Sequence, residues 1–499
     1  MRPTVLLRLA LAGSRTDTVR VVLTGFSAAL ATLAIVAALT VAAIPIVHDG
    51  NSNVSPQYRN PLIAEAGLRI GVEIALVLLT IPVLVLAAQC ARLGAPARDR
   101  RLAAIRMAGA GPRQAVAIAA TEASLASGLG ALAGLGIYLV GRQVLGRPGA
   151  DGKLALPTDV LPPAWQLAVV VISLPVLAGL IATLLLRRVA MTPYGVVRRV
   201  RTRAPGPWAG LLILGGLGVA ALLPPVTRHL EARGRSVSFE VFGLVLLVSE
   251  LAVTVGVIVG TGWISHFSGR VLHRFARRPA ALLAARRLMA DPWTGSRTLA
   301  ALLAAVLFGA FTAGLRIRMS TTFAAEDEHQ RRMAAAQNQP YVPTDHTFYE
   351  RAYEMVYLAL TVALVITAGG LLVALAESIV SRRRALAALV ATGVPRSILA
   401  RALAWQTLTP AVFGIGVAAA MGITLQRGLY DGDVSSSSTT VCSAENQCVD
   451  LPRIVHTVPL PLADVAGFAG VALAAVLVLL SVSLLFLRNS TALDELRAA

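Results

Sequence analysis

The chain is poor in charged residues. Only 14% of its 499 residues are Asp, Glu, Lys or Arg, whereas 56% are hydrophobic, and its mean hydropathy is +0.71. Soluble globular domains carry about 25% charged residues. The shortage of charge excludes a soluble globular protein, and because the apolar runs reach the ~20 residues that a bilayer requires, the sequence predicts an integral membrane protein.

Lysine is almost absent, since Lys153 is the single lysine of the chain. A phosphate-binding loop of the form G-x-x-x-x-G-K-[ST] needs a lysine followed by Ser or Thr, but Lys153 precedes Leu154. The sequence therefore predicts no ATP site. No Ser/His/Asp or Cys/His constellation stands out either, so no enzymatic activity and no cofactor are expected in this chain. The histidines also lack the spacing of metal-binding motifs, so no metal site is expected.

Runs long enough to cross a membrane predict about ten spans. The runs are rich in Leu, Ala and Val and lack the alternation of barrel strands, so we expect helices and an all-α integral membrane protein. The predicted spans cover residues 21–46, 70–91, 115–140, 165–186, 208–223, 241–264, 298–315, 355–379, 398–425 and 465–487.

Acidic residues are scarce relative to arginine, and the chain carries a formal net charge of +19. The arginines gather in the N-terminal segment and in alternate loops, at residues 98–113, 187–203, 270–297 and 382–396. By the positive-inside rule these loops are cytoplasmic, and an even number of spans places both termini in the cytoplasm as well. The basic residues flank apolar spans, which predicts contact with anionic membrane lipids and not with nucleic acid.

Cysteine is rare, with three residues in the whole chain. Cys442 and Cys448 share the polar loop 431–459, which the arginine distribution places outside, whereas Cys90 lies near the inner end of the second span. A disulfide between Cys442 and Cys448 requires an oxidising compartment, so it agrees with the predicted orientation. Two unpaired thiols are the alternative.

Two similar basic amphipathic stretches, residues 98–109 and 381–393, each lie between two apolar spans. Aligning Gly109 with Gly393 places Arg100 on Arg384 and Leu102 on Leu386. We therefore predict two parallel four-helix repeats, residues 1–190 and 281–499, joined by a two-helix linker at residues 191–280.

The chain resembles the FtsX-like (MacB/LolC-type) permeases of ABC transporters, in their ten-span form with two permease domains. The resemblance rests on the two basic stretches that end at Gly109 and Gly393, and on Glu122 at the start of a glycine-rich span. It also rests on the segment from Ala285 to Pro292. The second copy has Gln406 where the first has Glu122, which predicts that the two halves differ in function.

The resemblance implies a permease that uses a separate ABC ATPase dimer, which binds the ATP on the cytoplasmic side of a bacterial plasma membrane. It also implies that the basic stretches are coupling helices that dock on this dimer; anchoring to lipid is the alternative. The predicted coupling residues are Arg100, Arg101, Leu102, Ile105, Arg106 and Gly109 in the first copy, and Arg383, Arg384, Leu386, Leu389 and Gly393 in the second.

Carboxylates within spans form a second set of candidates, because each costs on the order of 2 to 4 kcal/mol in a bilayer. Glu122 and Glu377 lie near inner ends, where salt bridges with neighbouring arginines are expected. Glu250 lies within the sixth span without an acidic or basic neighbour in sequence. It is therefore the candidate for contact with substrate, a proton or another helix.

Three functions follow from these observations. The first is an ABC permease subunit that exports or extracts a lipid-like or peptide compound. The second is a mechanotransmitting subunit, which moves its outer loops to control an extracytoplasmic cell-wall enzyme or sensor and needs an extracytoplasmic protein partner. The third is a secondary transporter that is coupled to protons through Glu250.

Overall fold

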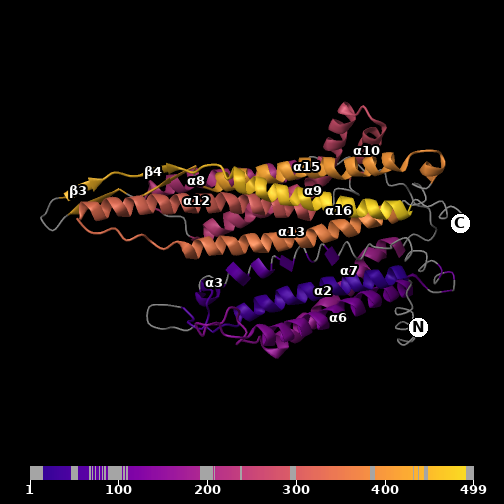
Figure 1. Cartoon of the computed structure of the whole chain (residues 1–499), viewed down its shortest axis with the longest axis horizontal. Helices are drawn as coiled ribbons and strands as arrows, with labels where there is room; N and C mark the ends of the chain where they lie inside the picture. The colour runs from indigo at the N-terminus through magenta and orange to yellow at the C-terminus, as the bar shows by residue number, and fades with distance from the viewer. Residues whose placement is uncertain are drawn as a thin grey trace. The chain divides into compact units, whose positions relative to one another are not determined.

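The computed structural model describes most of the chain. The described residues are 15–45, 54–66, 111–190, 208–235, 239–292, 299–381, 388–430, 432–436, 438–442 and 448–490, together with Gly206 and scattered positions between 69 and 109. They divide into two compact units, shown together in Figure 1. Unit 1 comprises residues 1–201, 361–396 and 482–499, and unit 2 comprises 202–360 and 397–481.

Unit 1 is built on the long helices α2 (Arg15–Ala42), α6 (Pro112–Leu145) and α7 (Ala164–Ala190), and α6 packs against both of the others. Glycines permit the close approach of α2 and α6. A β-carbon at Gly134 would lie 2.6 Å from the Ala29 carbonyl oxygen, and one at Gly130 would overlap Gly25. This is the small-residue packing that membrane helices use in place of a hydrophobic driving force.

The core of unit 1 lies between these helices. Val36, Val83 and Ala131 are almost completely buried there, and Ile366 from the second part of α13 (Thr347–Ser381) packs against them. A hydrogen bond of 2.6 Å also joins the hydroxyl groups of Thr40 and Tyr138, so the contact between α2 and α6 includes a satisfied polar pair.

Arg69 links the loops of unit 1 through hydrogen bonds. Its side chain is buried, with a relative exposure of 4%. Its guanidinium donates to five acceptors: the carbonyl oxygens of Ile44, Pro45, Ile63 and Ala64, and the hydroxyl of Ser55. The short helix α3 (Pro61–Ala64) lies in this segment, and backbone bridges join Val54 to Glu65 and Tyr58 to Leu154. One arginine thus organises the loop that follows α2.

Unit 2 contains more helices. They are α8 (Trp208–Glu231), α9 (Phe239–Phe275), α10 (Pro279–Ala290), α12 (Ala300–Ala336), the first part of α13, α15 (Arg396–Leu429) and most of α16 (Leu462–Ser490). Glycines again mark the close contacts. A β-carbon at Gly422 of α15 would lie 2.5 Å from the Leu307 carbonyl oxygen of α12, and Gly309 of α12 contacts Phe468 of α16.

Four short strands form two antiparallel pairs in the loop between α15 and α16. Strand β1 (Asp433–Ser435) pairs with β4 (Val455–Thr457), and β2 (Thr439–Cys442) pairs with β3 (Cys448–Leu451). Strands β1 and β4 also contact α12. Reading for long apolar runs does not detect such strands, because each is only three or four residues long and lies in a polar loop.

Within the described residues, nine helices have the length and composition of membrane spans. The chain therefore has the character of a predominantly α-helical, multi-pass membrane protein, as the sequence predicts. The tenth predicted span, at 70–91, lies largely outside the described residues. Unit 1 combines the first predicted domain with parts of the second, and unit 2 combines most of the linker with the rest of the second. The boundaries at 190 and 280 and the repeat arrangement therefore stay predictions.

Several helices continue beyond the predicted spans, and α12 shows this most clearly. Its apolar part ends near Leu315, but the helix runs on to Ala336 through a polar segment rich in Ala, Arg, Met and Glu. These residues have high helix propensity, so the helix persists although the hydropathy falls. The extension carries the end of α12 to the small strands of unit 2.

Candidate functional site

The second basic stretch ends in a defined helix terminus at Gly393. Residues 388–391 are helical, and Gly393 has a φ of +90°. The Val394 amide donates to the Leu389 carbonyl at 3.1 Å and the Gly393 amide to the Val390 carbonyl at 3.0 Å. This pair of bonds is the Schellman motif, in which glycine readily adopts the left-handed conformation. The chain then enters α15 at Arg396.

The first basic stretch also ends at a glycine in the left-handed conformation. Gly109 has a φ of +95°, and α6 begins three residues later at Pro112. The Gly111 amide donates to Gln114 Oε1 at 3.0 Å, which satisfies a free donor at the helix start. Helices α6 and α15 are each 34 residues long. Each basic stretch is thus followed by a left-handed glycine turn and a long membrane helix.

The predicted coupling residues are only partly described. Gly109, Leu389 and Gly393 lie at the two turns, and Leu389 is half-buried. Met107, which neighbours the first turn, is 84% exposed. The remaining coupling residues lie outside the described residues: Arg100, Arg101, Leu102, Ile105, Arg106, Arg383, Arg384 and Leu386.

The helix contacts also correspond between the two sequence copies. Since Gly393 and Gly109 are 284 positions apart (393 − 109), Gly130 of α6 aligns with Gly414 of α15. Gly130 packs against Gly25 of α2, and Gly414 packs against Leu303 of α12, 2.8 Å from the position of a β-carbon. Corresponding glycines therefore face the helix that begins each predicted repeat.

The three intramembrane carboxylates lie in different surroundings. Glu122 is buried on α6, with 7% exposure. Glu377 belongs to α13, but its side chain is not among those that the structure describes. Glu250 is half-buried on α9, and Phe242 of the same helix packs against the Tyr430 ring. Arg318 lies over the same ring, 4.9 Å from its centroid.

Helix α9 carries further polar groups on the face of Glu250. Thr254, Thr261, Ser265 and Ser268 follow Glu250 at helical spacing, and all four are buried. Thr261 and Ser268 donate to backbone carbonyls of their own helix. The hydroxyls of Thr254 and Ser265 have no hydrogen-bond partner among the described residues, and a buried polar group without a partner is costly.

A polar cluster joins α12, α13 and α16 in unit 2. Asp464 accepts from Arg316 at 3.5 Å and from Tyr357 at 3.4 Å, and Arg316 also lies over the Tyr357 ring. Sequence reasoning missed this cluster, because each residue flanks a different apolar span. The signal available was an arginine and an aspartate at the ends of the spans 298–315 and 465–487.

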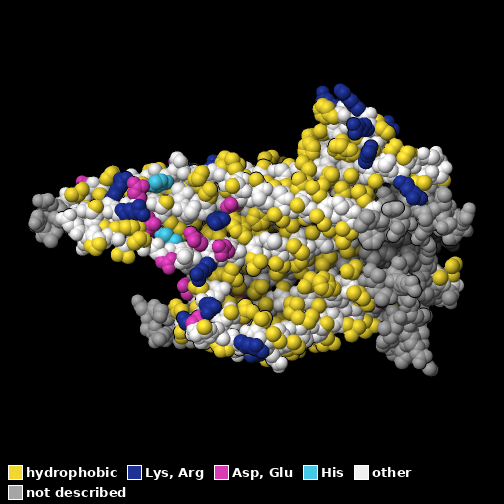
Figure 2. All heavy atoms as spheres, in the orientation of Figure 1, with side chains coloured by type: hydrophobic (Ala, Val, Ile, Leu, Met, Phe, Trp, Pro, Cys, Tyr) yellow, Lys and Arg dark blue, Asp and Glu magenta, His cyan; other side chains and the backbone are white. Residues whose placement is uncertain are grey.

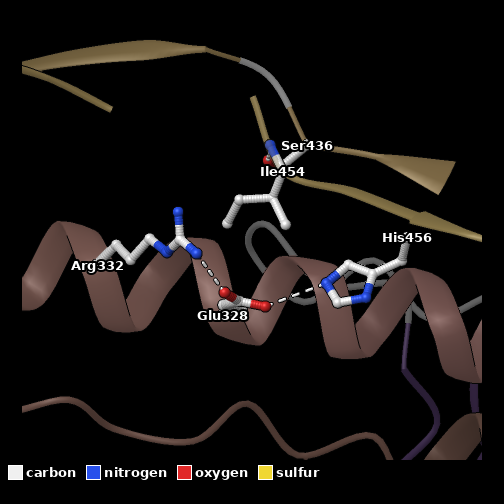
Figure 3. A network of polar contacts seen from close by, with 5 residues as sticks. All are labelled: Glu328, Arg332, Ser436, Ile454 and His456. Atoms are coloured by element: carbon white, nitrogen blue, oxygen red, sulfur yellow. Dashed lines mark hydrogen bonds and ion pairs between the residues drawn. The ribbon is translucent and has the colours of Figure 1, made fainter. Parts of the chain in front are cut away.

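Beyond this cluster, the polar extension of α12 is bonded to strand β4. Glu328 accepts from Arg332 one turn later and pairs with His456 Nε2 at 3.1 Å, as Figure 3 shows. Next to this contact, the Ser436 amide donates to the Ile454 carbonyl at 3.0 Å, and the Ile454 amide donates to the Ser436 hydroxyl at 3.2 Å. A side-chain contact thus joins α12 to strand β4 within unit 2.

The predicted disulfide lies in the same region. Cys448 is disulfide-bonded, and Cys442 is its cross-strand partner in the β2–β3 pair, the arrangement that the predicted bridge needs. Among the described residues, no group of His, Cys, Asp or Glu side chains is arranged to hold a metal ion.

No family model matches the chain, and no curated protein matches it.

Proposed function

We propose that this chain is the permease subunit of an ABC transporter. A separate ATPase dimer would dock on the two basic stretches and drive the export or extraction of a lipid-like or peptide compound. The observation that carries this proposal is the pair of left-handed turns at Gly109 and Gly393, each leading into a 34-residue membrane helix. Two matching contact points suit a two-fold partner.

The packing of the helices offers a route for the movement. A force on the second basic stretch would enter α15 through the turn at Gly393, because that turn is fixed by the Schellman bonds. Helix α15 is in close contact with α12 at Gly422. With 37 residues, α12 is a rod of about 55 Å at 1.5 Å per residue, long enough to cross a membrane and project beyond it.

The link between α12 and β4 favours a second candidate, the mechanotransmitting subunit. The Glu328–His456 contact would carry the motion of α12 to the small strands, where an extracytoplasmic protein could sense it. Both candidates share the ATPase on the cytoplasmic side and differ in what the outer end contacts.

The first test is purification of the tagged full-length chain from its native membrane in mild detergent, followed by an ATPase assay. We expect a stoichiometric ATPase to co-purify, and R383A/R384A to lose it because the basic face of the coupling stretch is removed. The control is R233A/R235A, which removes two exposed arginines from the segment after α8. Recovery of an extracytoplasmic protein in the same preparation would favour signalling over export.

The proton-coupled alternative predicts that different substitutions abolish the activity. The half-buried Glu250 and the hydroxyls on its face of α9 would then carry the activity, so E250Q would abolish it while R383A/R384A would not. A chain that is active in proteoliposomes without any ATPase would contradict both ABC functions.

A further inference from the structure

The end of α9 and helix α10 form a strongly basic surface in unit 2, which we call the basic elbow. It comprises residues 270–290, and its exposed arginines are Arg270, Arg274, Arg277, Arg278 and Arg286. Figure 2 shows Lys and Arg side chains gathered where α10 projects sideways from the long helices of its unit (Figure 1). The sequence has no Asp or Glu from Leu251 to Ala290.

The basic elbow is held rigidly. Helix α10 buries Ala281, Ala285 and Leu288 on one face, and Leu288 packs closely against Gly269 of α9, with its Cβ 2.9 Å from where a glycine β-carbon would stand. The opposite face, which carries Arg286, is left exposed. Since its apolar face is already covered by α9, α10 presents its arginines to an external partner.

These arginines lack counter-charges within the described part of the chain. None of the five makes an ion pair or a side-chain hydrogen bond there. The N-terminus of a helix favours negative charge, but the start of α10 has none. Arg278 is its N-cap residue and makes no side-chain cap bond, and the first turn contains no acidic residue. An external anion would therefore stabilise the start of α10.

An exposed aromatic side chain points to a membrane surface as the source of the anion. Phe275, beside Arg274 at the end of the α9 span, is 73% exposed. Arginines beside an exposed apolar ring suit the boundary between headgroups and acyl chains.

We propose that the basic elbow is a binding site for anionic phospholipids, whose phosphate groups contact Arg274, Arg277 and Arg278 while Phe275 enters the acyl boundary. The site anchors the end of α9 and α10 to the membrane surface. The proposal does not depend on the ABC function, because it concerns the lipid that surrounds the chain and not a compound that it moves.

The test uses the full-length chain, purified and delipidated in detergent, and measures its thermal unfolding midpoint and bound lipid by native mass spectrometry. The probes are phosphatidylglycerol and phosphatidylcholine. We expect phosphatidylglycerol to bind and raise the midpoint, and R277Q/R278Q to weaken its binding roughly 30-fold, because each basic residue near an anionic surface contributes about a factor of five. Raising the salt to 1 M should weaken the binding similarly by screening.

The matched control is R233Q/R235Q, which removes the same number of exposed arginines at the opposite end of the α8–α9 hairpin. It should retain the phosphatidylglycerol effect. Equal effects of the two lipids, or equal losses in the two double variants, would overturn the proposal. So would unchanged lipid binding by R277Q/R278Q together with loss of a co-purifying protein, which would make the elbow a protein-docking surface.

Discussion

Arg69 makes the most demanding set of contacts of any single side chain described in unit 1. Because its five donors are directed at neutral acceptors in a buried loop, Arg69→Ala would leave several buried carbonyls unpaired. We expect a loss of unfolding free energy on the order of 3 kcal/mol, measured by chemical denaturation of the purified chain. Arg69→Lys should not restore stability, since lysine offers three donors at one point and arginine a planar fork.

Arg59 is the control, because it lies ten residues earlier in the same loop region but is exposed. Its removal should change stability little, as is usual for exposed salt bridges. A similar loss in Arg59→Ala and Arg69→Ala would show that the guanidinium network of Arg69 does not hold the loop.

The salt bridge between Arg59 and Asp151 predicts a local response to pH. The guanidinium contacts both carboxylate oxygens, at 2.9 and 3.0 Å, and this hydrogen bonding lowers the pKa of Asp151 below its usual range. The salt bridge therefore stabilises the folded state at pH values above the ordinary carboxyl pKa of about 4. This stabilisation is lost as the pH falls through the lower pKa that Asp151 has in the folded state.

Hydrogen exchange of residues 146–163 should reveal this effect when wild type and Asp151→Ala are compared at each pH. We expect the wild type to be the better protected at pH 6, and the difference to vanish near pH 2. A difference that persists unchanged across this range would mean that the carboxylate charge is not what holds the segment.

Glycines decide how closely the helices pack, and α15 contains a matched pair. Gly422→Ala would place a β-carbon 2.5 Å from the Leu307 carbonyl oxygen, whereas Gly416→Ala would meet nothing within 4 Å. We expect Gly422→Ala to lower the thermal unfolding midpoint and Gly416→Ala to leave it unchanged or raise it, since alanine is the better helix former. Scanning fluorimetry of both variants makes the comparison, and a neutral Gly422→Ala would contradict the close contact of α12 with α15.

The sequence predicts some of these features and not others, for physical reasons. The membrane helices follow from local composition, and the turn at Gly393 follows from a basic amphipathic run that stops at glycine. The role of Arg69 could not be predicted, because its acceptors come from residues 44 to 64 and meet only in the folded loop. The polar end of α12 was missed because hydropathy detects the membrane part of a helix and not its continuation.

The domain arrangement makes a prediction about the membrane topology of the whole chain. Met107 and Ala391 are exposed residues next to the two glycine turns, and six described spans lie between them: α6, α7, α8, α9, α12 and α13. An even number of crossings places both positions on the same side, as parallel repeats require. Ala150 and Ala335, exposed near the far ends of α6 and α12, should lie on the other side.

Single-cysteine labelling in cells tests this topology. In a Cys90→Ala background, with Cys442 and Cys448 kept for the predicted bridge, we expect A150C and A335C to react with an impermeant maleimide in intact cells. M107C and A391C should react only after permeabilisation, because the positive-inside rule places the basic stretches in the cytoplasm. Labelling of M107C and A391C from opposite sides would require an odd number of crossings between the two turns. The repeats would then be inverted, and a single ATPase dimer could not contact both basic stretches.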